Sequence, residues 1–162
     1  MDKDMVEVSV QVEVMDLFFF MFQHTYRSIS GICGVLFSVA AFFVLLWTWG
    51  TVSTSYMVLL AVCSVLFTVI NPIMLFVKAA KQAALNPSVK TPTVYFFGEK
   101  EFVMKQGKEE ASAQYSSLYR IRNTKRYIYL YGTANRANII SKKQLGTQAQ
   151  RVTELVMNGF HQ

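Results

Sequence analysis

Two long apolar stretches decide the fold of this chain: ISGICGVLFSVAAFFVLLWTW at residues 29–49 and YMVLLAVCSVLFTVINPIMLFV at residues 56–77. A helix needs about 20 apolar residues to cross a hydrocarbon core about 30 Å thick, and each stretch is that long. No Asp, Glu, Lys, Arg or His lies within residues 28–77. The alternative is a buried helical hairpin of a soluble protein, but a protein of this size can hardly bury two such stretches. We therefore predict a transmembrane helical hairpin over residues 29–77.

The charges that flank the hairpin predict its orientation. Arg27 precedes the first stretch, Lys78 and Lys81 follow the second, and residues 50–55 between the stretches carry no charge. Basic flanks stay on the cytoplasmic side of a membrane. We therefore expect two spans with both termini in the cytoplasm and only residues 50–55 outside it.

Small and polar residues recur on one face of each apolar stretch. Their spacing of three and four residues places each set on one side of a helix. Small residues let helix backbones approach closely, and hydroxyls and amides can bond across the contact. Pro72 should kink the second helix, because it has no N–H for the carbonyl of Thr68. We predict helix packing, within the hairpin or between copies, through Gly31, Gly34, Ser38, Ala61, Ser64, Thr68 and Asn71.

Residues 6–14 alternate valine with polar residues, VEVSVQVEV. Strict alternation predicts a strand with one buried face. One strand is not stable alone, so its partners must come from beyond residue 78. Residues 1–16 are therefore expected to supply the first strand of a cytoplasmic domain into which the hairpin is inserted. Residues 17–28 should form a helix capped by Asp16, lying either in the membrane interface or against the cytoplasmic domain.

The chain beyond the hairpin is rich in β-forming residues. Residues 78–92 are expected to extend the second helix into the cytoplasm and end in a linker, and residues 93–162 to form a β-domain. Turn residues divide this domain into short strands, and an amphipathic helix is expected at residues 148–160. With the first strand, the prediction is a membrane α+β fold with a small seven-stranded β-barrel and a C-terminal helix. The expected later strands are 93–97, 101–106, 110–115, 118–124, 127–131 and 138–141.

The order of these features resembles the YcxB-like family of bacterial membrane proteins, whose C-terminal region is similar to bacterial pleckstrin-homology (PH) domains. The resemblance rests on the alternating strand, on Asp16 followed by an aromatic helix, on the hairpin, and on IISKKQL at residues 139–145 before the last helix. The family pattern there is similar to Ile-Pro-Lys-Arg-x-Phe, with Ser141, Lys143 and Leu145 standing here for Pro, Arg and Phe. The resemblance implies the PH-like fold and a bacterial cell membrane, but neither an activity nor catalytic residues.

Few motifs in the chain carry chemistry. We find no zinc-protease, phosphate-loop or nucleophile pattern, and so expect no enzyme, no catalytic residue, no cofactor and no metal. The feature that stands out is positive charge, because residues 78–162 hold fourteen basic and five acidic residues. Basic side chains gather at Arg120, Arg122, Lys125, Arg126, Lys142 and Lys143.

This basic cluster has three interpretations. It can be a solvated strand edge whose charges discourage edge pairing. It can bind anionic lipid headgroups. Beside tyrosines it can contact nucleic acid, but the membrane tether argues against a nucleic-acid partner.

We expect a non-enzymatic binding, scaffold or regulatory module in the inner membrane, with the lipid bilayer and either anionic headgroups or an unknown protein segment as partners. The alternative is a subunit of an oligomeric channel or transporter, motivated by Ser38, Ser64, Thr68 and Asn71. Two spans cannot enclose a pore, so this alternative requires a homo-oligomer.

Overall fold

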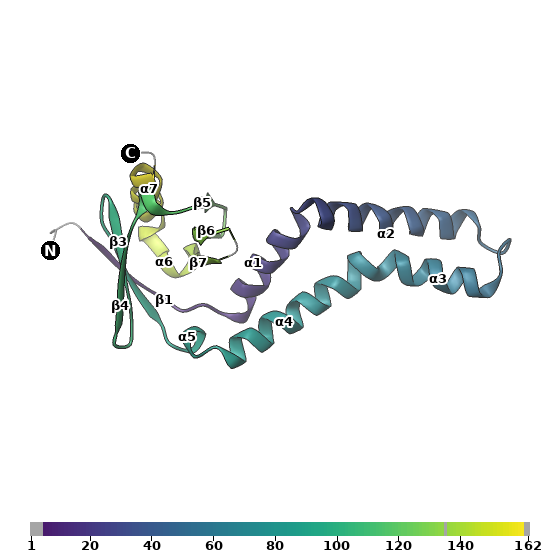
Figure 1. The fold of residues 1–162 in the computed structure, drawn as a ribbon, viewed down its shortest axis with the longest axis horizontal. Coiled ribbons are helices and arrows are strands. Elements are labelled where there is room, and N and C mark those ends of the chain that lie inside the picture. The colour runs from purple at the N-terminus through teal and green to yellow at the C-terminus, as the bar shows by residue number, and fades with distance from the viewer. Residues whose placement is uncertain (1–4, 135, 161–162) are drawn as a thin grey trace. The chain divides into compact units, whose positions relative to one another are not determined.

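The computed structural model describes residues 5–134 and 136–160, which belong to two compact units. The β-unit joins Met1–Asp16 to Ala83–Gln162, and the hairpin unit is formed by Leu17–Gln82. Figure 1 shows the chain leaving the β-unit after its first strand and re-entering it after the hairpin.

The first strand of the β-unit pairs with the strand that follows the hairpin. Val6, Val8 and Val10 are buried while the residues between them are exposed, as the alternation predicts. Val6 lies opposite Phe97 in an antiparallel ladder. The strand ends at Val10 and is shorter than the predicted 6–14. The first sheet is antiparallel in the order β1 (Val6–Val10), β2 (Thr93–Phe97), β3 (Glu101–Gln106) and β4 (Glu109–Gln114).

The remaining strands form a second, separate antiparallel sheet, in the order β5 (Arg120–Asn123), β6 (Tyr127–Thr133) and β7 (Arg136–Ser141). Seven strands are present in the part of the chain that the structure describes, as predicted, but they form two open sheets, so the expected seven-stranded barrel is not confirmed. The chain leaves β4 through a 3-10 turn, Tyr115–Ser117. The Tyr115 N–H bonds back to the Lys100 carbonyl at 3.1 Å, one pair beyond the last β3–β4 pair, and the chain then turns toward β5.

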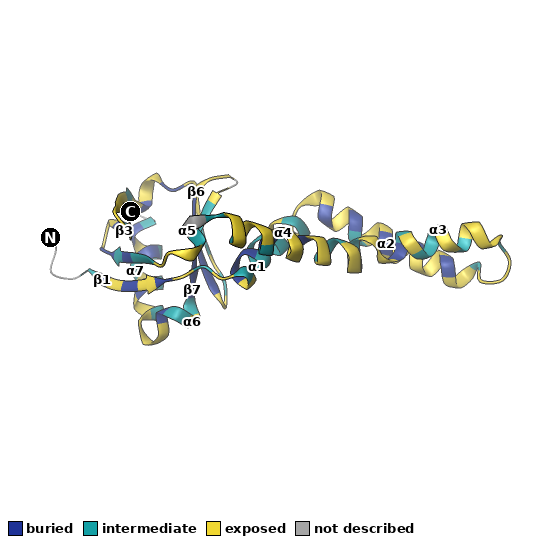
Figure 2. Ribbon diagram, turned by 90° about the horizontal axis from the view of Figure 1, so that it is seen from below, coloured by how far each residue is buried: buried dark blue, intermediate teal, exposed yellow. Residues whose placement is uncertain are grey.

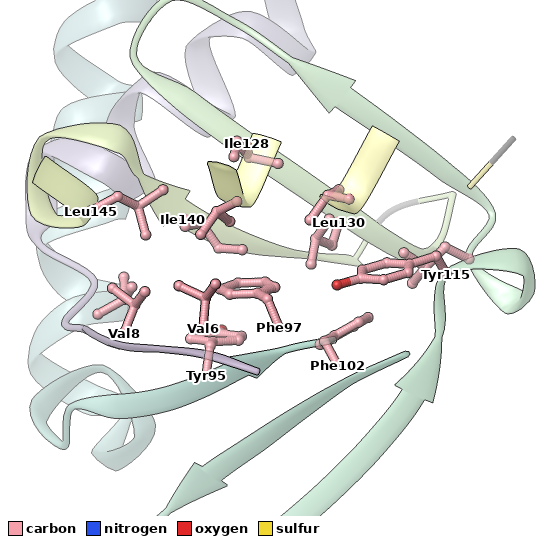
Figure 3. Packing of buried hydrophobic residues seen from close by; sticks show 14 residues of the cluster. Val6, Val8, Tyr95, Phe97, Phe102, Tyr115, Ile128, Leu130, Ile140 and Leu145 are labelled. Atoms are coloured by element: carbon pink, nitrogen blue, oxygen red, sulfur yellow. The ribbon is translucent and has the colours of Figure 1, made fainter. Parts of the chain in front are cut away.

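The core of the β-unit lies between the two sheets. Side chains from β1, β2 and β3 point toward side chains from β6 and β7 (Figure 3). Phe97, Phe102 and Leu130 are completely buried there. Helix α7 (Ala149–Phe160) adds Val152 and Val156 from its apolar face. Burial of these apolar side chains is the main term that stabilises the unit, at about 25 cal/mol per Å² removed from water.

Buried tyrosines extend this core. The Tyr115 hydroxyl donates to the Gly98 carbonyl at 3.1 Å, which satisfies the one polar group that its ring brings inside. Burial raises the pKa of Tyr115 well above its usual range and raises the pKa of Tyr95 to about 12. Both phenols therefore stay protonated under ordinary conditions.

Helix α1 (Val14–Tyr26) begins three residues before the predicted start. The Asp16 carboxylate accepts the Glu13 N–H at 2.9 Å, and the Asp16 N–H donates to the Glu13 carbonyl at 3.1 Å. Glu13 therefore occupies the N-cap position and Asp16 the third helical position, as in a capping box. The prediction that Asp16 precedes the helix is wrong, although its side chain does bind a free N–H at the helix start.

Two helical segments of the hairpin unit are long and apolar enough to cross a membrane. The first is α2 (Ile29–Trp47), whose N-terminal Gly31 N–H is capped by the Ser28 hydroxyl. The second runs from Thr54 to Leu85, so it begins two residues before the predicted span and includes the expected helical extension beyond residue 77. It consists of α3 (Thr54–Val65), a π-helical turn (Leu66–Ile70) and α4 (Asn71–Leu85). A short helix, α5 (Pro87–Lys90), occupies the expected linker.

The π-helical turn lies directly before Pro72, where a kink is predicted. The Asn71 N–H bonds to the Leu66 carbonyl, five residues back. In this register the Phe67 carbonyl would bond to residue 72, and proline has no N–H to donate. The Tyr26 hydroxyl donates to the Phe67 carbonyl instead. The π-helical turn is therefore stabilised by a side chain from α1, which bonds to the Phe67 carbonyl that Pro72 leaves unpaired.

Ser38 supports the same turn from α2. Its hydroxyl donates to the Cys63 carbonyl at 2.9 Å and accepts the Phe67 N–H at 3.2 Å. In a regular α-helix those two backbone groups would bond to each other, since they are four residues apart. Ser38 is fully buried and bridges the gap between them.

The packing stripe of α2 lies buried, as the dark face of that helix in Figure 2 shows. A Cβ atom at Gly34 would overlap the ring of Phe67, so the glycine is what allows this contact. The buried positions of α2 are Gly31, Gly34, Ser38, Ala41 and Leu45.

The stripe of the second helix is less regular. Ser64 is buried and Ala61 and Asn71 are half-buried, but Thr68 is exposed, unlike the expected packing position. A π-helical turn holds more residues than an α-helical turn, so the spacing of three and four no longer keeps residues on one face. Phe67 occupies the seam instead.

Candidate anion-binding pocket

Four of the six predicted basic residues line one open pocket of the β-unit, which we call the basic pocket. Lys125 and Arg126 come from the turn between β5 and β6, and Lys142 and Lys143 from the short helix α6 (Lys142–Leu145), where a loop is expected. The pocket has a volume of about 590 Å³. Its other lining residues are Glu13, Met15, Asp16, Tyr127, Ser141 and Gln144.

Backbone hydrogen bonds hold the two basic segments beside each other. The Thr124 hydroxyl accepts the Tyr127 N–H and donates to the Tyr127 carbonyl, both at 2.9 Å, which closes the turn that carries Lys125 and Arg126. The Lys142 N–H donates to the Arg126 carbonyl at 2.9 Å, which joins α6 to that turn. The positions of the basic side chains therefore follow from local backbone structure.

Gln144 brings the segment after the first strand to the same pocket. Its side-chain carbonyl accepts the Gln11 N–H, and its side-chain NH₂ donates to the Gln11 carbonyl, each at 2.8 Å. One amide thus replaces a neighbouring strand at the edge of the first sheet. The sequence does not predict that Gln144 and Glu13 line this pocket, because no local pattern at either position indicates a contact this distant in sequence.

Arg120 and Arg122 do not line the basic pocket. They lie on β5 opposite Tyr131 and Tyr129, and the Arg120 guanidinium lies 4.7 Å from the centre of the Tyr131 ring. This distance is typical of a cation–π contact. The predicted cluster of six therefore divides into a pocket group of four and a strand group of two.

The basic pocket is positive overall but also contains carboxylates. Asp16 is almost fully buried and accepts hydrogen bonds from the Glu13 N–H and the Tyr127 hydroxyl. Burial, together with the bond to Asp16, raises the pKa of Tyr127 to about 12, so the phenol remains a donor. The Lys142 ammonium donates to the Asn123 side-chain carbonyl at 2.6 Å. Exposed cations on a fixed frame can hold a phosphate or carboxylate by charge-assisted hydrogen bonds.

In residues 5–134 and 136–160 no group of three or more His, Cys, Asp or Glu side chains is placed to hold a metal ion. The two cysteines, Cys33 and Cys63, are both free thiols.

The fold and the pocket define the class of this protein: a small unit of two antiparallel sheets with a C-terminal helix, interrupted by two helices that could span a membrane. Residues 97–155 match the model of a family described as YcxB-like protein, which is the family that the sequence resembles. The matched segment runs from the end of β2 into α7 and includes all six predicted basic residues. No curated protein and no solved structure matches the chain.

Proposed function

We propose that this chain is an integral protein of the bacterial cell membrane whose cytoplasmic β-unit is a non-enzymatic, PH-like module that binds anionic lipid headgroups. The observation that carries the proposal is the basic pocket, in which Lys125, Arg126, Lys142 and Lys143 converge on one open cavity. A protein segment rich in acidic side chains would use the same chemistry. The lipid surface is favoured because a membrane anchor keeps it permanently within reach.

Exposure of apolar side chains supports the membrane anchor. Only 28% of the most apolar window of α2 is buried, and only 11% of that of the second helical segment. Leu36, Phe43 and Trp47 are more than half exposed on α2. A helix that is apolar on all sides belongs either in a protein core or in a lipid bilayer, and no core covers these faces.

The basic flanks support a cytoplasmic β-unit. Lys78 and Lys81 extend α4 beyond its apolar part, and Arg27 precedes α2. The loop between the two helical segments carries no charge. Under the positive-inside rule, both ends of the hairpin then face the cytoplasm, where the inner leaflet carries negative charge.

The energy of the proposed contact is substantial. Each basic residue near an anionic membrane surface contributes about 1 kcal/mol. The four basic residues of the pocket would contribute about 4 kcal/mol together, or roughly a thousandfold in affinity. Bidentate bonding by Arg126 would add geometric preference for phosphate oxygens.

The alternative, an oligomeric channel or transporter subunit, is less favoured because the polar groups that motivate it are already bonded inside the hairpin. Ser38 bridges two backbone groups of the second helical segment. Ser64 donates to the Ala61 carbonyl and Thr68 to the Ser64 carbonyl. The Asn71 amide donates to the Tyr26 hydroxyl at 3.3 Å. The hydroxyl and amide groups of all four side chains therefore have hydrogen-bond partners within the hairpin unit.

The proposal can be tested on the full-length protein in micelles of a neutral detergent. Binding of short-chain phosphatidylglycerol and of short-chain diacylglycerol, which has no phosphate, is measured for the wild type, for Lys125→Gln/Arg126→Gln/Lys142→Gln/Lys143→Gln, and for the control Lys100→Gln/Lys108→Gln/Arg136→Gln/Arg151→Gln. Both variants lose the same charge, but only the first loses it from the pocket. We expect preference for the anionic lipid in the wild type and control only. Equal binding of both lipids, or equal loss in both variants, would refute the proposal.

A further inference from the structure

The basic pocket is lined by side chains of both charges. Glu13 is exposed among its lining residues, together with Lys125 and Lys143. In the described residues, no ion pair joins Glu13 to either lysine. Asp16 lies on the same side of the pocket as Glu13 and adds its negative charge, although its carboxylate already accepts two hydrogen bonds.

Both signs of charge are held on fixed backbone. Glu13 is the N-cap of α1, and its N–H and carbonyl both bond to Asp16. Lys143 lies on α6, which is joined to the turn carrying Lys125 by the bond from the Lys142 N–H to the Arg126 carbonyl. The pocket therefore has an acidic wall from the N-terminal segment and a basic wall from the β5–β6 turn and α6.

We propose that the basic pocket binds a zwitterionic aminoalkyl phosphate, with the phosphate on the basic wall and the ammonium group at Glu13. This inference rests on the proposed function, because it specifies the headgroup that the same pocket takes. A phosphate alone would contact only the basic wall, whereas a ligand that also carries an ammonium group would contact both walls. A volume of about 590 Å³ lies within the range of small-ligand sites.

The same chemistry occurs in the headgroup of phosphatidylethanolamine and in a soluble aminoalkyl phosphate. The test uses the full-length protein in neutral-detergent micelles and two matched soluble probes, O-phosphoethanolamine and ethyl phosphate, which differ in the amino group. Dissociation constants are measured by calorimetry. We expect the wild type to bind O-phosphoethanolamine about fivefold more tightly, the ratio for one exposed ion pair of about 1 kcal/mol.

Variants then separate the two walls. Glu13→Gln keeps the backbone bonds to Asp16 and should weaken O-phosphoethanolamine binding about fivefold, without weakening ethyl phosphate binding. Lys143→Gln should weaken both probes alike. Glu101→Gln, which removes an exposed carboxylate of β3 outside the pocket, should change neither. Equal affinity of the wild type for both probes, or an equal effect of Glu13→Gln on both, would overturn the inference.

The outcomes also separate this inference from the proposed function. If both probes bind and Lys143→Gln weakens both, but no amino preference is found, the inference fails and headgroup binding stands. If neither probe binds, and neither short-chain phosphatidylethanolamine nor short-chain phosphatidylglycerol binds, both fail. Tighter binding of short-chain phosphatidylethanolamine than of O-phosphoethanolamine supports the inference with a lipid ligand, and equal binding supports it with a soluble one.

Discussion

The hydroxyl of Ser38 is the group whose removal should cost the hairpin most for its size. It makes two hydrogen bonds to the other helical segment, at 2.9 Å to the Cys63 carbonyl and 3.2 Å from the Phe67 N–H. Interhelical hydrogen bonds in membranes average about 0.6 kcal/mol each, and up to about 1.7 kcal/mol. Ser38→Ala should therefore lower the free energy of unfolding of the hairpin unit by about 1–3 kcal/mol.

Thr68→Val is the matched control for this prediction. Thr68 also carries a hydroxyl in the hairpin, but it is exposed and bonds only within its own helix, to the Ser64 carbonyl. Its loss should change the free energy of unfolding by less than about 0.5 kcal/mol. The measurement is the loss of helical circular dichroism of the full-length protein when SDS is titrated into neutral-detergent micelles. If Ser38→Ala were no more destabilising than Thr68→Val, the proposed bridge across the π-helical turn would be refuted.

Three further predictions concern the hairpin, the sheet edge and the core. Gly34→Leu should destabilise the hairpin in the same titration because its side chain overlaps Phe67, and Phe67→Ala should restore part of the loss; independent, additive effects would contradict the contact. Gln144→Leu should lower the free energy of unfolding of the β-unit by about 1–2 kcal/mol and speed amide hydrogen exchange at Gln11, because it removes both bonds to the Gln11 backbone. An unchanged exchange rate at Gln11 would contradict this role of Gln144. Between pH 10 and 12 the protein should lose stability against urea, because burial raises the pKa of Tyr95 to about 12 and the unfolded state loses its proton first. Tyr95→Phe should flatten this pH dependence, and an unchanged slope would contradict it.

Local pattern predicts much of this fold. The strands at residues 93–97 and 101–106 have the bounds that their β-forming residues and flanking turns predict. The alternating valines predict both the buried face of β1 and its need for partners beyond the hairpin, and its pairing with β2 agrees with this. These features follow from the spacing of apolar residues along short segments, which the chain displays directly.

The other features of the fold and the pocket depend on contacts between segments that are distant in sequence. The chain turns at Tyr115 between the first sheet and the second. No local sequence pattern predicts the bond from the Tyr115 N–H to the Lys100 carbonyl at this turn. The π-helical turn depends on hydroxyls of Ser38 and Tyr26 on other helices. Basic residues that are close in sequence likewise lie in different places: Arg122 lies opposite Tyr129 on the neighbouring strand, whereas Lys125 lines the basic pocket.

The most direct test is a disulfide cross-link between the strands on either side of the hairpin, formed in intact membranes after Cys33 and Cys63 are replaced by serine. Ser9 and Val94 lie directly opposite each other in the β1–β2 ladder. Directly opposite Cβ atoms lie about 4.5–5.5 Å apart, which is within reach of a disulfide after small movements. We predict that Ser9→Cys/Val94→Cys cross-links readily on mild oxidation, and that Ser9→Cys/Phe96→Cys, two residues out of register, does so far less. No cross-link, or equal cross-linking of the two pairs, would show that the segments before and after the hairpin do not share one sheet.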